Sequence, residues 1–569
     1  MEPRRASDRV RACAALLTVL LVGACACRCG GSGTRDAPPS GAKAILLITV
    51  EGLVGERLSV FGGDVGTPSL ESIARDGVAW RDAWTVCPMS RPAVATYLTG
   101  VSPDRHQVWD DLFTPLAPEA ATLAEALQAA GYETAAFPGT SFLGRSSGVL
   151  QGFDVVDDPP QQALWQRLPR FKEAATIAQD VKSWLTGRPS AKPYFAWIHF
   201  ADPGQAQLDE KPGGLDEATR AVDSAIGEIL TAVRDRGGRE GAAIVVAGTY
   251  ADLSGGGEGV PGAGFSVDER AVRVPVIARL PGAAALTGVR ASPVWAPDIA
   301  FTLARVGGVR LDASEGIDLR EPAPPGRLRF AWSRAPRDQM GWQPLTAARR
   351  GVSEATEALA LRPVLRAGDT IGLDRVQPVL AALGVKVRPL PAAGREFGPK
   401  EKRRAVGQSV WAARRLVHAR KPKEALDAYA TAARLDPQAL APLLEQASLT
   451  VTGESRPRGA DLLREAAGLY PWSPEALHLY GHLIFLSGSR GDAETLWTAV
   501  LQVWPTEMDV LYDLACMRSL AGDLEASEGY LRRAVQNGFS QWVHIESDPD
   551  LRNLRASPRF AALMKDLRR

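Results

Sequence analysis

Long apolar stretches alternate with amphipathic ones over roughly the first two thirds of the chain. Four apolar stretches rich in β-branched and aromatic residues are typical of strands buried on both faces: residues 44–50, 132–137, 194–200 and 242–248. Amphipathic segments between them predict helices: residues 67–77, 120–132 and 215–238. Strands that alternate with helices indicate an α/β domain with a mainly parallel sheet.

The strand ends and one helix start are the places where this pattern predicts a site. In parallel sheets, ligands bind at the carboxyl ends of the strands. Those ends are residues 51–52, 201–205 and 249–252. Within residues 80–100 the chain breaks at Pro88, and Ser90 begins a helix of small residues that ends at Gly100. Free backbone N–H groups at such a start favour an anionic ligand. A serine that only caps the helix is the alternative.

The last third of the chain carries a repeat with a fixed spacing of 34 residues. The spacing shows first in the prolines: Pro437, Pro471 and Pro505, with Phe539 in the next position. Small residues recur in the same register: Ala413, Ala447, Gly481 and Ala515, and Ala425, Gly459, Ala493 and Ser527. We expect about four helical pairs over residues 406–541, closed by a capping segment at 542–554. A plain helical bundle is the alternative.

The first thirty residues are typical of a targeting segment. Four arginines precede an apolar stretch at residues 12–24 that is too short to span a membrane comfortably. The stretch ends V-G-A-C, which resembles the lipobox of bacterial lipoproteins, so we expect residues 1–25 to be the signal peptide and Cys25 to be lipidated. An ordinary signal peptide or an uncleaved anchor is the alternative. Residues 26–42 are predicted to be a flexible linker.

Composition narrows the class of protein. The 569 residues can form two or three domains, and a net charge of +1 with 23% charged residues argues against disorder and against a nucleic-acid partner. Apart from the four cysteines of the targeting segment, only Cys87 and Cys516 remain, in different predicted domains, so we expect no structural disulfide. The charged run at residues 398–404 marks a domain boundary.

Short motifs of the first domain resemble, in their order, the sulfatase branch of the alkaline phosphatase superfamily. They are I-L-L-I-T-V at 45, T-P-S-L at 67, Y-L-T-G at 97, H-F-A-D-P at 199 and R-V-P-V-I-A-R-L-P-G at 273. The resemblance implies a mainly parallel sheet sandwiched by helices over residues 43–400, with a smaller subdomain at about 327–400. The repeat of residues 401–569 resembles the tetratricopeptide repeat (TPR), which implies an all-α solenoid whose groove binds a protein or peptide.

The sulfatase resemblance implies a divalent metal that is held by carboxylates and activates a hydroxyl or formylglycine nucleophile. Most ligand positions of the family carry other residues here: they read Glu51-Gly52, Gly204, Thr249-Tyr250 and Ala263-Gly264. Ser90 stands at the nucleophile's position. The family has an arginine that is needed for formylglycine formation four residues later, and this chain has Val94 there. Cys87 is an alternative nucleophile, three residues too early in this frame.

One retained carboxylate seldom holds Mg²⁺ or Ca²⁺, so we expect no metal site and no cofactor. The remaining candidates for the site are Ser90, the acids Glu51 and Asp252, and the histidines His106 and His199, each of which could equally be structural. The sequence therefore predicts a sulfatase-like pseudoenzyme. The alternative is an active sulfuric-ester or phosphoester hydrolase that uses Ser90 with Ca²⁺ or Mg²⁺.

The predicted partners follow from the three parts of the chain. We expect a protein or peptide in the repeat groove and the membrane at the lipid anchor, which would place the protein in the bacterial cell envelope, at its periplasmic or outer-membrane face. A third interpretation is a sulfated or phosphorylated glycan that is bound at the former active site without turnover.

Overall fold

The computed structural model describes most of the chain after residue 40. The described residues are 41–111, 114–158, 170–188, 192–209, 211–236, 241–254, 262–282, 286–341, 343–350, 356–357, 373–392, 394–450, 456–539 and 541–567. The predicted signal peptide, Cys25 and nearly all of the linker lie outside them and stay predictions. Among the described helices, none is both long and apolar enough to cross a membrane.

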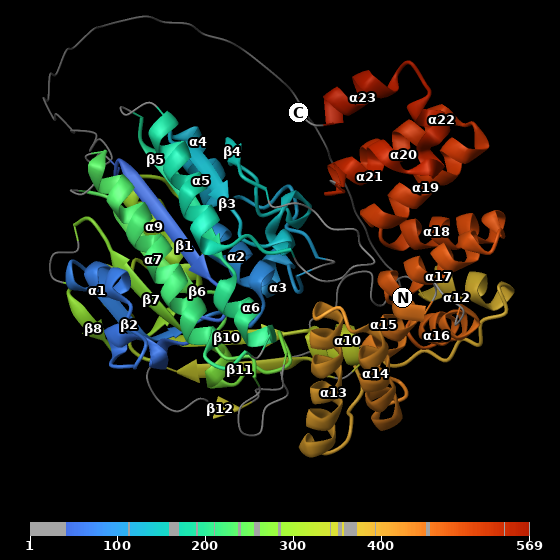
Figure 1. Ribbon diagram of the computed structural model, residues 1–569, viewed down its shortest axis with the longest axis horizontal. Coiled ribbons are helices and arrows are strands. Elements are labelled where there is room, and N and C mark those ends of the chain that lie inside the picture. The colour runs from blue at the N-terminus through green and yellow to red at the C-terminus, as the bar shows by residue number, and fades with distance from the viewer. Residues whose placement is uncertain are drawn as a thin grey trace, which may run out of the picture. The chain divides into compact units, whose positions relative to one another are not determined.

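A nine-stranded sheet forms the centre of the first part of the chain (Figure 1). Its strands are β1 (Ala44–Val50), β2 (Val78–Trp84), β3 (Glu133–Phe137), β4 (Val155–Val156), β5 (Tyr194–Phe200), β6 (Ala243–Gly248), β7 (Arg273–Arg279), β8 (Gly288–Arg290) and β9 (Val294–Trp295). The order is β4-β3-β5-β1-β6-β7-β2-β8, with β9 beside β2. Pairing is parallel except on both sides of β7, which runs antiparallel to β6 and β2. The predicted α/β class with a mainly parallel sheet is confirmed.

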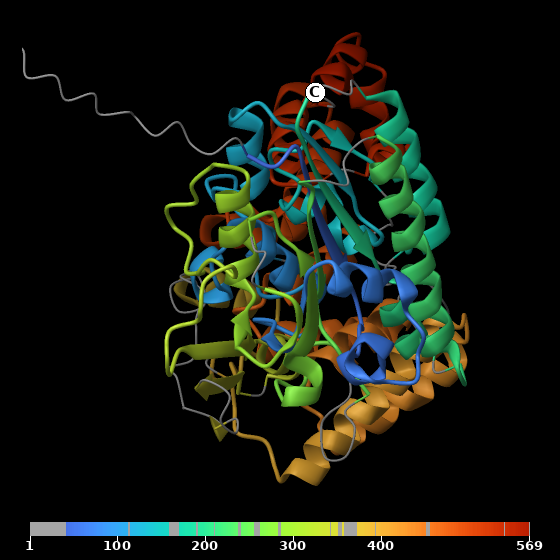
Figure 2. The ribbon, with the colours of Figure 1, turned by 90° about the vertical axis from the view of Figure 1, so that its left-hand side faces the viewer.

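Helices cover both faces of this sheet because its central strands are apolar on both sides. Leu46 and Ile48 of β1 pack in one cluster with α1 (Pro68–Arg75), α5 (Ala174–Gly187) and α7 (Gly214–Asp235). Ile45 and Leu47 pack in the opposite cluster with α2 (Ser90–Thr99), α4 (Leu123–Ala129) and α9 (Pro297–Val306). Figure 2 shows α5 and α7 side by side along one face. The other described helices of this part are α3 (Pro103–His106), α6 (Asp202–Asp209) and α8 (Glu269–Val272).

A small antiparallel sheet follows, in the range where the smaller subdomain is predicted. It contains β10 (Leu328–Ser333), β11 (Leu345–Arg350) and β12 (Thr356–Glu357), and is accompanied by α10 (Ala335–Met340) and α12 (Leu373–Ala382). The buried Arg329 of β10 donates to the Asp82 carboxylate of β2 at 2.8 Å, which ties the two sheets together. Val376 and Leu380 of α12 pack instead in the apolar cluster of the C-terminal helices.

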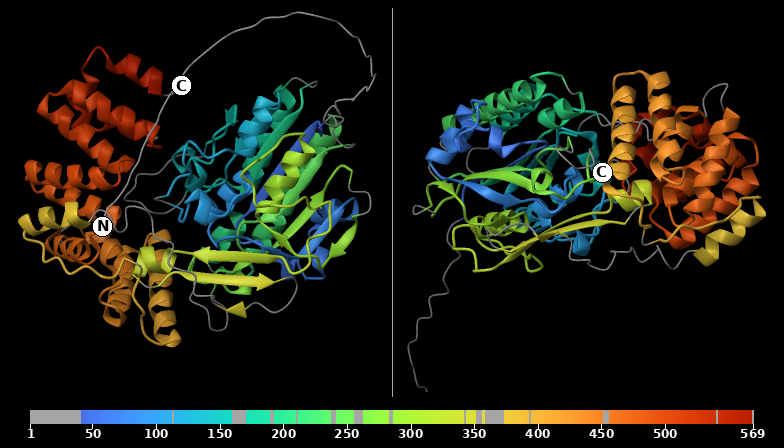
Figure 3. Two further views of the ribbon diagram at one scale, coloured as in Figure 1. Left: turned by 180° about the vertical axis from the view of Figure 1, so that it is seen from behind. Right: turned by 90° about the horizontal axis from the view of Figure 1, so that it is seen from below.

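The C-terminal region is helical, as predicted (Figure 3). The starts of its helices keep the 34-residue spacing. The paired helices are α13 (Lys400–His418), α14 (Pro422–Leu435), α15 (Leu440–Thr450), α16 (Arg456–Leu469), α17 (Pro474–Leu486), α18 (Arg490–Val503), α19 (Met508–Ala521) and α20 (Leu524–Gln536). The second helices of successive pairs begin at Pro422, Arg456, Arg490 and Leu524. The repeated small residues Ala413, Ala425, Ala447, Ala493 and Ala515 are fully buried between helices.

The end of the chain covers the last helical pair. It forms α21 (Trp542–Ser547), α22 (Arg552–Arg555) and α23 (Phe560–Leu567). Ile545 and Leu551, within the predicted capping segment, are fully buried against Leu511 of α19 and Leu531 of α20. The segment therefore shields an apolar face that the last pair would otherwise expose.

Gly481 of α17 is expected to resist replacement, although glycine is a poor helix former. A Cβ at this position would lie 2.3 Å from Nε1 of Trp497, whose side chain is fully buried and cannot move aside. We expect Gly481→Ala to destabilise the helical region by about 1–3 kcal/mol. Gly529→Ala is the matched control: its Cβ meets open space on α20, so about 0.5–1 kcal/mol of stabilisation is expected. Denaturant midpoints of the two variants measure the difference, and a stabilising Gly481→Ala would contradict it.

Candidate functional site

The site forms where three parallel strands end and α2 begins. The backbone N–H of Glu51 donates to the carbonyl of Phe200 at the end of β5, and the N–H of Thr249 donates to the carbonyl of Val50. The backbone hydrogen bonds between these strands therefore continue one residue beyond the end of β1. Ser90 is the first residue of α2, and its hydroxyl donates to Oε1 of Glu51 at 2.5 Å. Both side chains are almost fully buried.

The Glu51 carboxylate accepts two further hydrogen bonds. His199 of β5 places Nε2 3.1 Å from Oε1, to which it donates in the tautomer that carries its hydrogen on Nε2. The Tyr250 hydroxyl donates to Oε2 at 3.1 Å. Behind His199, its Nδ1 lies 2.8 Å from the Thr49 hydroxyl, which accepts from the indole N–H of Trp197 at 2.9 Å. Ser90, His199 and Tyr250 together engage both oxygens of Glu51.

This arrangement does not fit the divalent metal that the sulfatase resemblance implies. A Cβ at Gly204 would lie 2.4 Å from the Tyr250 hydroxyl and 2.9 Å from Oε2 of Glu51, so a histidine ligand cannot enter at Gly204. The oxygens of Glu51 face protein donors. Among the described residues, no group of three or more His, Cys, Asp or Glu side chains is placed to hold a metal ion. Hard cations require several free oxygen ligands, and both oxygens of Glu51, the one acid kept from the family's ligand set, already have protein partners.

A second carboxylate, Asp111, occupies the N-terminus of α2. Its Oδ1 accepts from the backbone N–H of Arg91 at 2.7 Å, which is the type of donor that a sulfate or phosphate would use at this helix end. Burial raises the pKa of Asp111 to about 7, and the charges of Glu51 and Asp110 act in the same direction. The Arg91 guanidinium donates to the carbonyl of Phe142 at 3.0 and 2.9 Å.

Cys87 does not provide an alternative nucleophile. The side chain is fully buried, and burial together with the charges of Asp111 and Asp110 raises the pKa of its thiol well above the ordinary value. A reactive cysteine needs the thiolate, which this surrounding disfavours. Cys87 and Cys516 are both free thiols, as expected.

Two of the predicted site residues lie apart from Glu51. His106 of α3 contacts the Thr96 hydroxyl through Nε2 at 3.0 Å and accepts the Val108 backbone N–H at Nδ1, also at 3.0 Å. Burial lowers its pKa to about 3, so it is a neutral structural residue. The half-buried Asp252 accepts the backbone N–H of Ser254 at 2.8 Å and is not among the residues that line the cavity described below.

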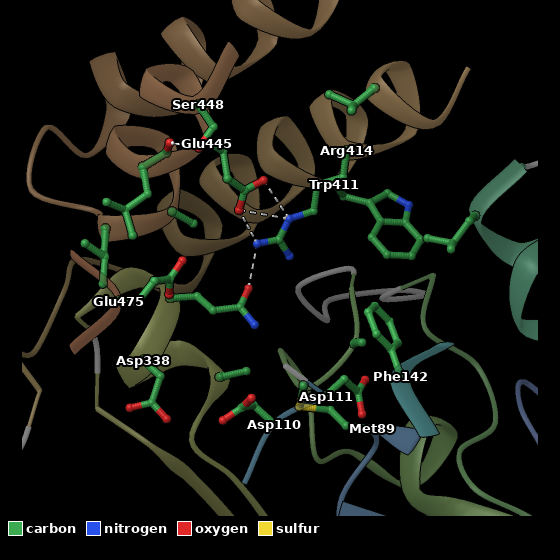
Figure 4. Close-up of a pocket in the computed structure, with 18 of the residues that line it drawn as sticks. Met89, Asp110, Asp111, Phe142, Asp338, Trp411, Arg414, Glu445, Ser448 and Glu475 are labelled. Atoms are coloured by element: carbon green, nitrogen blue, oxygen red, sulfur yellow. Dashed lines mark hydrogen bonds and ion pairs between the residues drawn. The ribbon is translucent and has the colours of Figure 1, made fainter. Parts of the chain in front are cut away.

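A cavity of about 270 Å³ opens above Glu51 and Ser90. Figure 4 shows its two walls: Met89, Asp110 and Asp111 on the side of the α/β domain, and Trp411, Arg414 and Glu445 on the side of the helical region. The latter wall is held by an ion pair of 2.6 Å between Arg414 and Glu445. Arg414 also donates to the Gln339 side chain of α10 at 2.7 Å.

Sequence reasoning missed the acids Asp110 and Asp111 and the covering Trp411. Two adjacent acids inside a predicted domain were a signal that could have been weighed. Trp411 carried no such signal, because only packing shows whether a helical tryptophan lines a core or a cavity. Tyr250 was noted as a departure from the family pattern, but its contact with Glu51 was not foreseen.

Comparisons with known proteins agree with the motifs. Residues 43–309 match the sulfatase family. An ulvan-active sulfatase of Formosa agariphila is 24% identical over 318 residues, which cover 46% of this chain and 61% of that protein. An arylsulfatase of Klebsiella aerogenes is 24% identical over 231 residues, covering 34% and 47%. The phosphonate monoester hydrolase structure of Agrobacterium radiobacter matches with a TM-score of 0.44 and 19% identity, covering 60% of this chain and 94% of that one.

The chain spans about half to three fifths of the length of these two sulfatases. The activities in their names are those of the two relatives. The match to the family covers residues 43–309 of this chain. Residues 43–309 of the chain form a domain of the sulfatase family.

Proposed function

We propose that this chain is a sulfatase-family protein without hydrolytic activity that serves as a binding protein. The observation that carries the proposal is the engagement of Glu51 by Ser90, His199 and Tyr250. The one acid that remains of the family's ligand set is thereby used inside the protein. Sulfate-ester hydrolysis in the family relies on a metal that activates the nucleophile and clamps the sulfate oxygens. Within the described part of the chain, no group of three or more His, Cys, Asp or Glu side chains is placed to hold it.

The charge of the site also opposes the family's substrates. A sulfate or phosphate ester at Ser90 would approach Glu51, Asp110 and Asp111, all of which line the cavity. Like charges a few ångströms apart in a buried site repel strongly. The helix N-terminus that would offset this repulsion is occupied by Asp111.

For the remainder of the chain we propose the roles that the sequence predicts. The helical region acts as a TPR-type array that binds a protein or peptide, supported by the 34-residue recurrence of its helix starts. Lipidation at Cys25 would hold the protein at a membrane of the bacterial cell envelope. Under this proposal the protein needs no divalent metal.

An active hydrolase is the second candidate, because the Ser90 hydroxyl already donates to Glu51 at 2.5 Å. In that geometry the carboxylate could accept the serine proton during attack on an ester. In that case Ser90 would be the nucleophile, and removing its hydroxyl would abolish turnover.

One assay separates the two candidates. We expect the full chain to release no product from aryl sulfate, aryl phosphate or aryl phosphonate esters with Mg²⁺, Ca²⁺ or Mn²⁺, and to match Ser90→Ala. We also expect no shift of the melting temperature on addition of these ions, since binding to the folded state would raise it. Turnover that Ser90→Ala abolishes would overturn the proposal, and contaminating hydrolases are excluded because their activity would persist in Ser90→Ala.

A further inference from the structure

We propose that the cavity above Ser90 binds a small neutral molecule, one with an aromatic or alkyl body and an oxygen that accepts a hydrogen bond. The inference rests on the proposed function, because a hydrolase of sulfate esters would have to take a charged ester in the same place. It names the class of ligand that the binding protein would hold there.

Charged side chains in the upper walls of the cavity already have partners inside the protein. In the helical region, Arg414 pairs with Glu445 at 2.6 Å. On α10, the Asp338 carboxylate is contacted by two guanidinium groups, that of Arg337 at 2.6 Å and that of Arg334 at 3.3 Å. An ionic ligand would have to compete with pairs that are already formed, whereas a neutral ligand would leave them intact.

The two acids at the floor are compensated as well. The charge of the buried Arg91 acts on both Asp110 and Asp111, and Asp111 accepts the Arg91 backbone N–H at 2.7 Å. Burial raises the pKa of Asp111 to about 7, so part of the molecules carry this carboxyl uncharged near neutral pH. An ion that enters the cavity gives up its hydration, and it recovers this cost only where an opposite charge is available. The floor and the walls therefore favour a ligand without charge.

Apolar side chains line the same cavity and supply the second argument. They include Met89, Phe142, Phe171, Leu208, Leu253 and Trp411. Phe142, Phe171 and Leu208 are only half-buried, so a ligand that covered them would remove apolar surface from water. An apolar cavity of about 150 Å³ is large enough for benzene. The cavity of about 270 Å³ therefore suits a fused pair of aromatic rings or a short alkyl chain.

Gln339 of α10, which also lines the cavity, supplies a polar contact without charge. Its side-chain oxygen accepts from Arg414 at 2.7 Å, and this bond identifies the other end of the amide as the NH₂ group. Among the described residues the NH₂ group has no acceptor. Ligand sites commonly combine an apolar lining with a few polar groups that orient the ligand. An uncharged oxygen, such as that of a ketone, would accept from this amide.

Both parts of the chain contribute to this site. Tyr250 and Leu253 of the sulfatase-family domain form one apolar cluster with Trp411 of α13, and all three line the cavity. A ligand in the cavity would enlarge this cluster and contact the former active site and the helical region at the same time. We therefore expect the bound ligand to raise the melting temperature of the full chain, since it binds only the folded protein.

Three probes that share one ring system test the proposal by calorimetry on the full chain. Methyl naphthyl ketone is neutral, naphthyl sulfate is an anion and naphthylmethylamine is a cation, all substituted at the same ring position. We expect saturable binding of the ketone and at least tenfold weaker binding of both ions. Absent ketone binding, or equal or tighter binding of either ion, would overturn this inference and leave the proposed function standing. Release of naphthol from naphthyl sulfate would overturn the proposed function and the inference with it.

A matched pair of variants tests whether the ketone occupies this cavity. Phe171→Ala removes a ring from the wall, and we expect it to weaken ketone binding about tenfold. Phe560→Ala is the control, because this phenylalanine is also half-buried but lies on α23, outside the cavity. It should leave ketone binding unchanged.

Two further variants address the space and the polar contact. Ser448→Trp on α15 fills the cavity and should abolish ketone binding, and Phe171→Ala stays informative if this variant fails to fold. Gln339→Met removes the amide donor at a similar side-chain volume and should weaken ketone binding about three- to tenfold. Ketone binding that survives both Phe171→Ala and Ser448→Trp would overturn the inference. An unchanged affinity in Gln339→Met would overturn its assignment of an acceptor oxygen.

Discussion

Replacing Glu51 by glutamine is expected to destabilise the sulfatase-family domain by about 1–3 kcal/mol. The glutamine amide keeps one oxygen but puts an NH₂ group where the carboxylate accepts a hydrogen bond. If the amide oxygen takes the place of Oε1, the Tyr250 hydroxyl has to accept from the NH₂ group where it now donates, and the Ser90 hydroxyl donates to a neutral oxygen, which is a weaker bond by about 1 kcal/mol. The loss of charge removes a further part of the bond with His199. The urea or thermal midpoint of the first transition measures the effect.

The direction of this change separates the proposed site from a metal site. Where acids are gathered to hold a cation, neutralising one of them relieves repulsion in the metal-free protein and raises stability. Ser90→Ala is the control, because it removes one neutral donor and leaves Glu51 with His199 and Tyr250; we expect it to cost about 1 kcal/mol or less. A Glu51→Gln variant that melts above the wild type would show that Glu51 is an electrostatically strained ligand after all.

Local pattern was sufficient to predict much of the fold. β1 and β5 have the predicted bounds because strands buried on both faces are apolar throughout. The helix starts of the C-terminal region follow the proline spacing because each pair repeats the same short-range packing. β2 was not predicted, since Arg81 and Asp82 interrupt its apolar run; Arg81 is exposed, and Asp82 is paired with Arg329.

The candidate site was less accessible to sequence reasoning, because its contacts join distant segments. Tyr250 and Glu51 are 199 positions apart, and their hydrogen bond depends on the parallel pairing of β1 with β6. The Arg91 backbone bond to Asp111 depends on the fold of the loop after α3. The family comparison located Glu51 and Ser90 as positions, but it could not show which groups had moved into the space that the missing ligands left.

The buried acids of the cavity are expected to lower the stability of the folded protein, and this cost supports a binding role. A buried carboxylate is costly to desolvate, and a core without function would be more stable with apolar residues in its place. Proteins that keep destabilising groups in a cavity commonly do so where a ligand is bound. Asp111, which is buried against Glu51 and Asp110, is the residue where this cost can be measured directly.

Asp111→Asn is expected to stabilise the protein, and the gain should grow with pH. The folded-state pKa of Asp111 is raised to about 7 from an ordinary value of 3.8, so the folded protein holds this proton where the unfolded chain releases it. Wild-type stability therefore falls as the pH rises between these two values and stays low above them, by up to about 4 kcal/mol. Asparagine removes the charge and keeps an oxygen for the Arg91 N–H. Denaturant unfolding of both proteins at equal ionic strength should show the gap widening by about 2–3 kcal/mol from about pH 5 to about pH 8. A gap that is constant or narrows toward pH 8 would mean that Asp111 is ionised in the folded protein throughout, and that the negative charge at the start of α2 is compensated within the site.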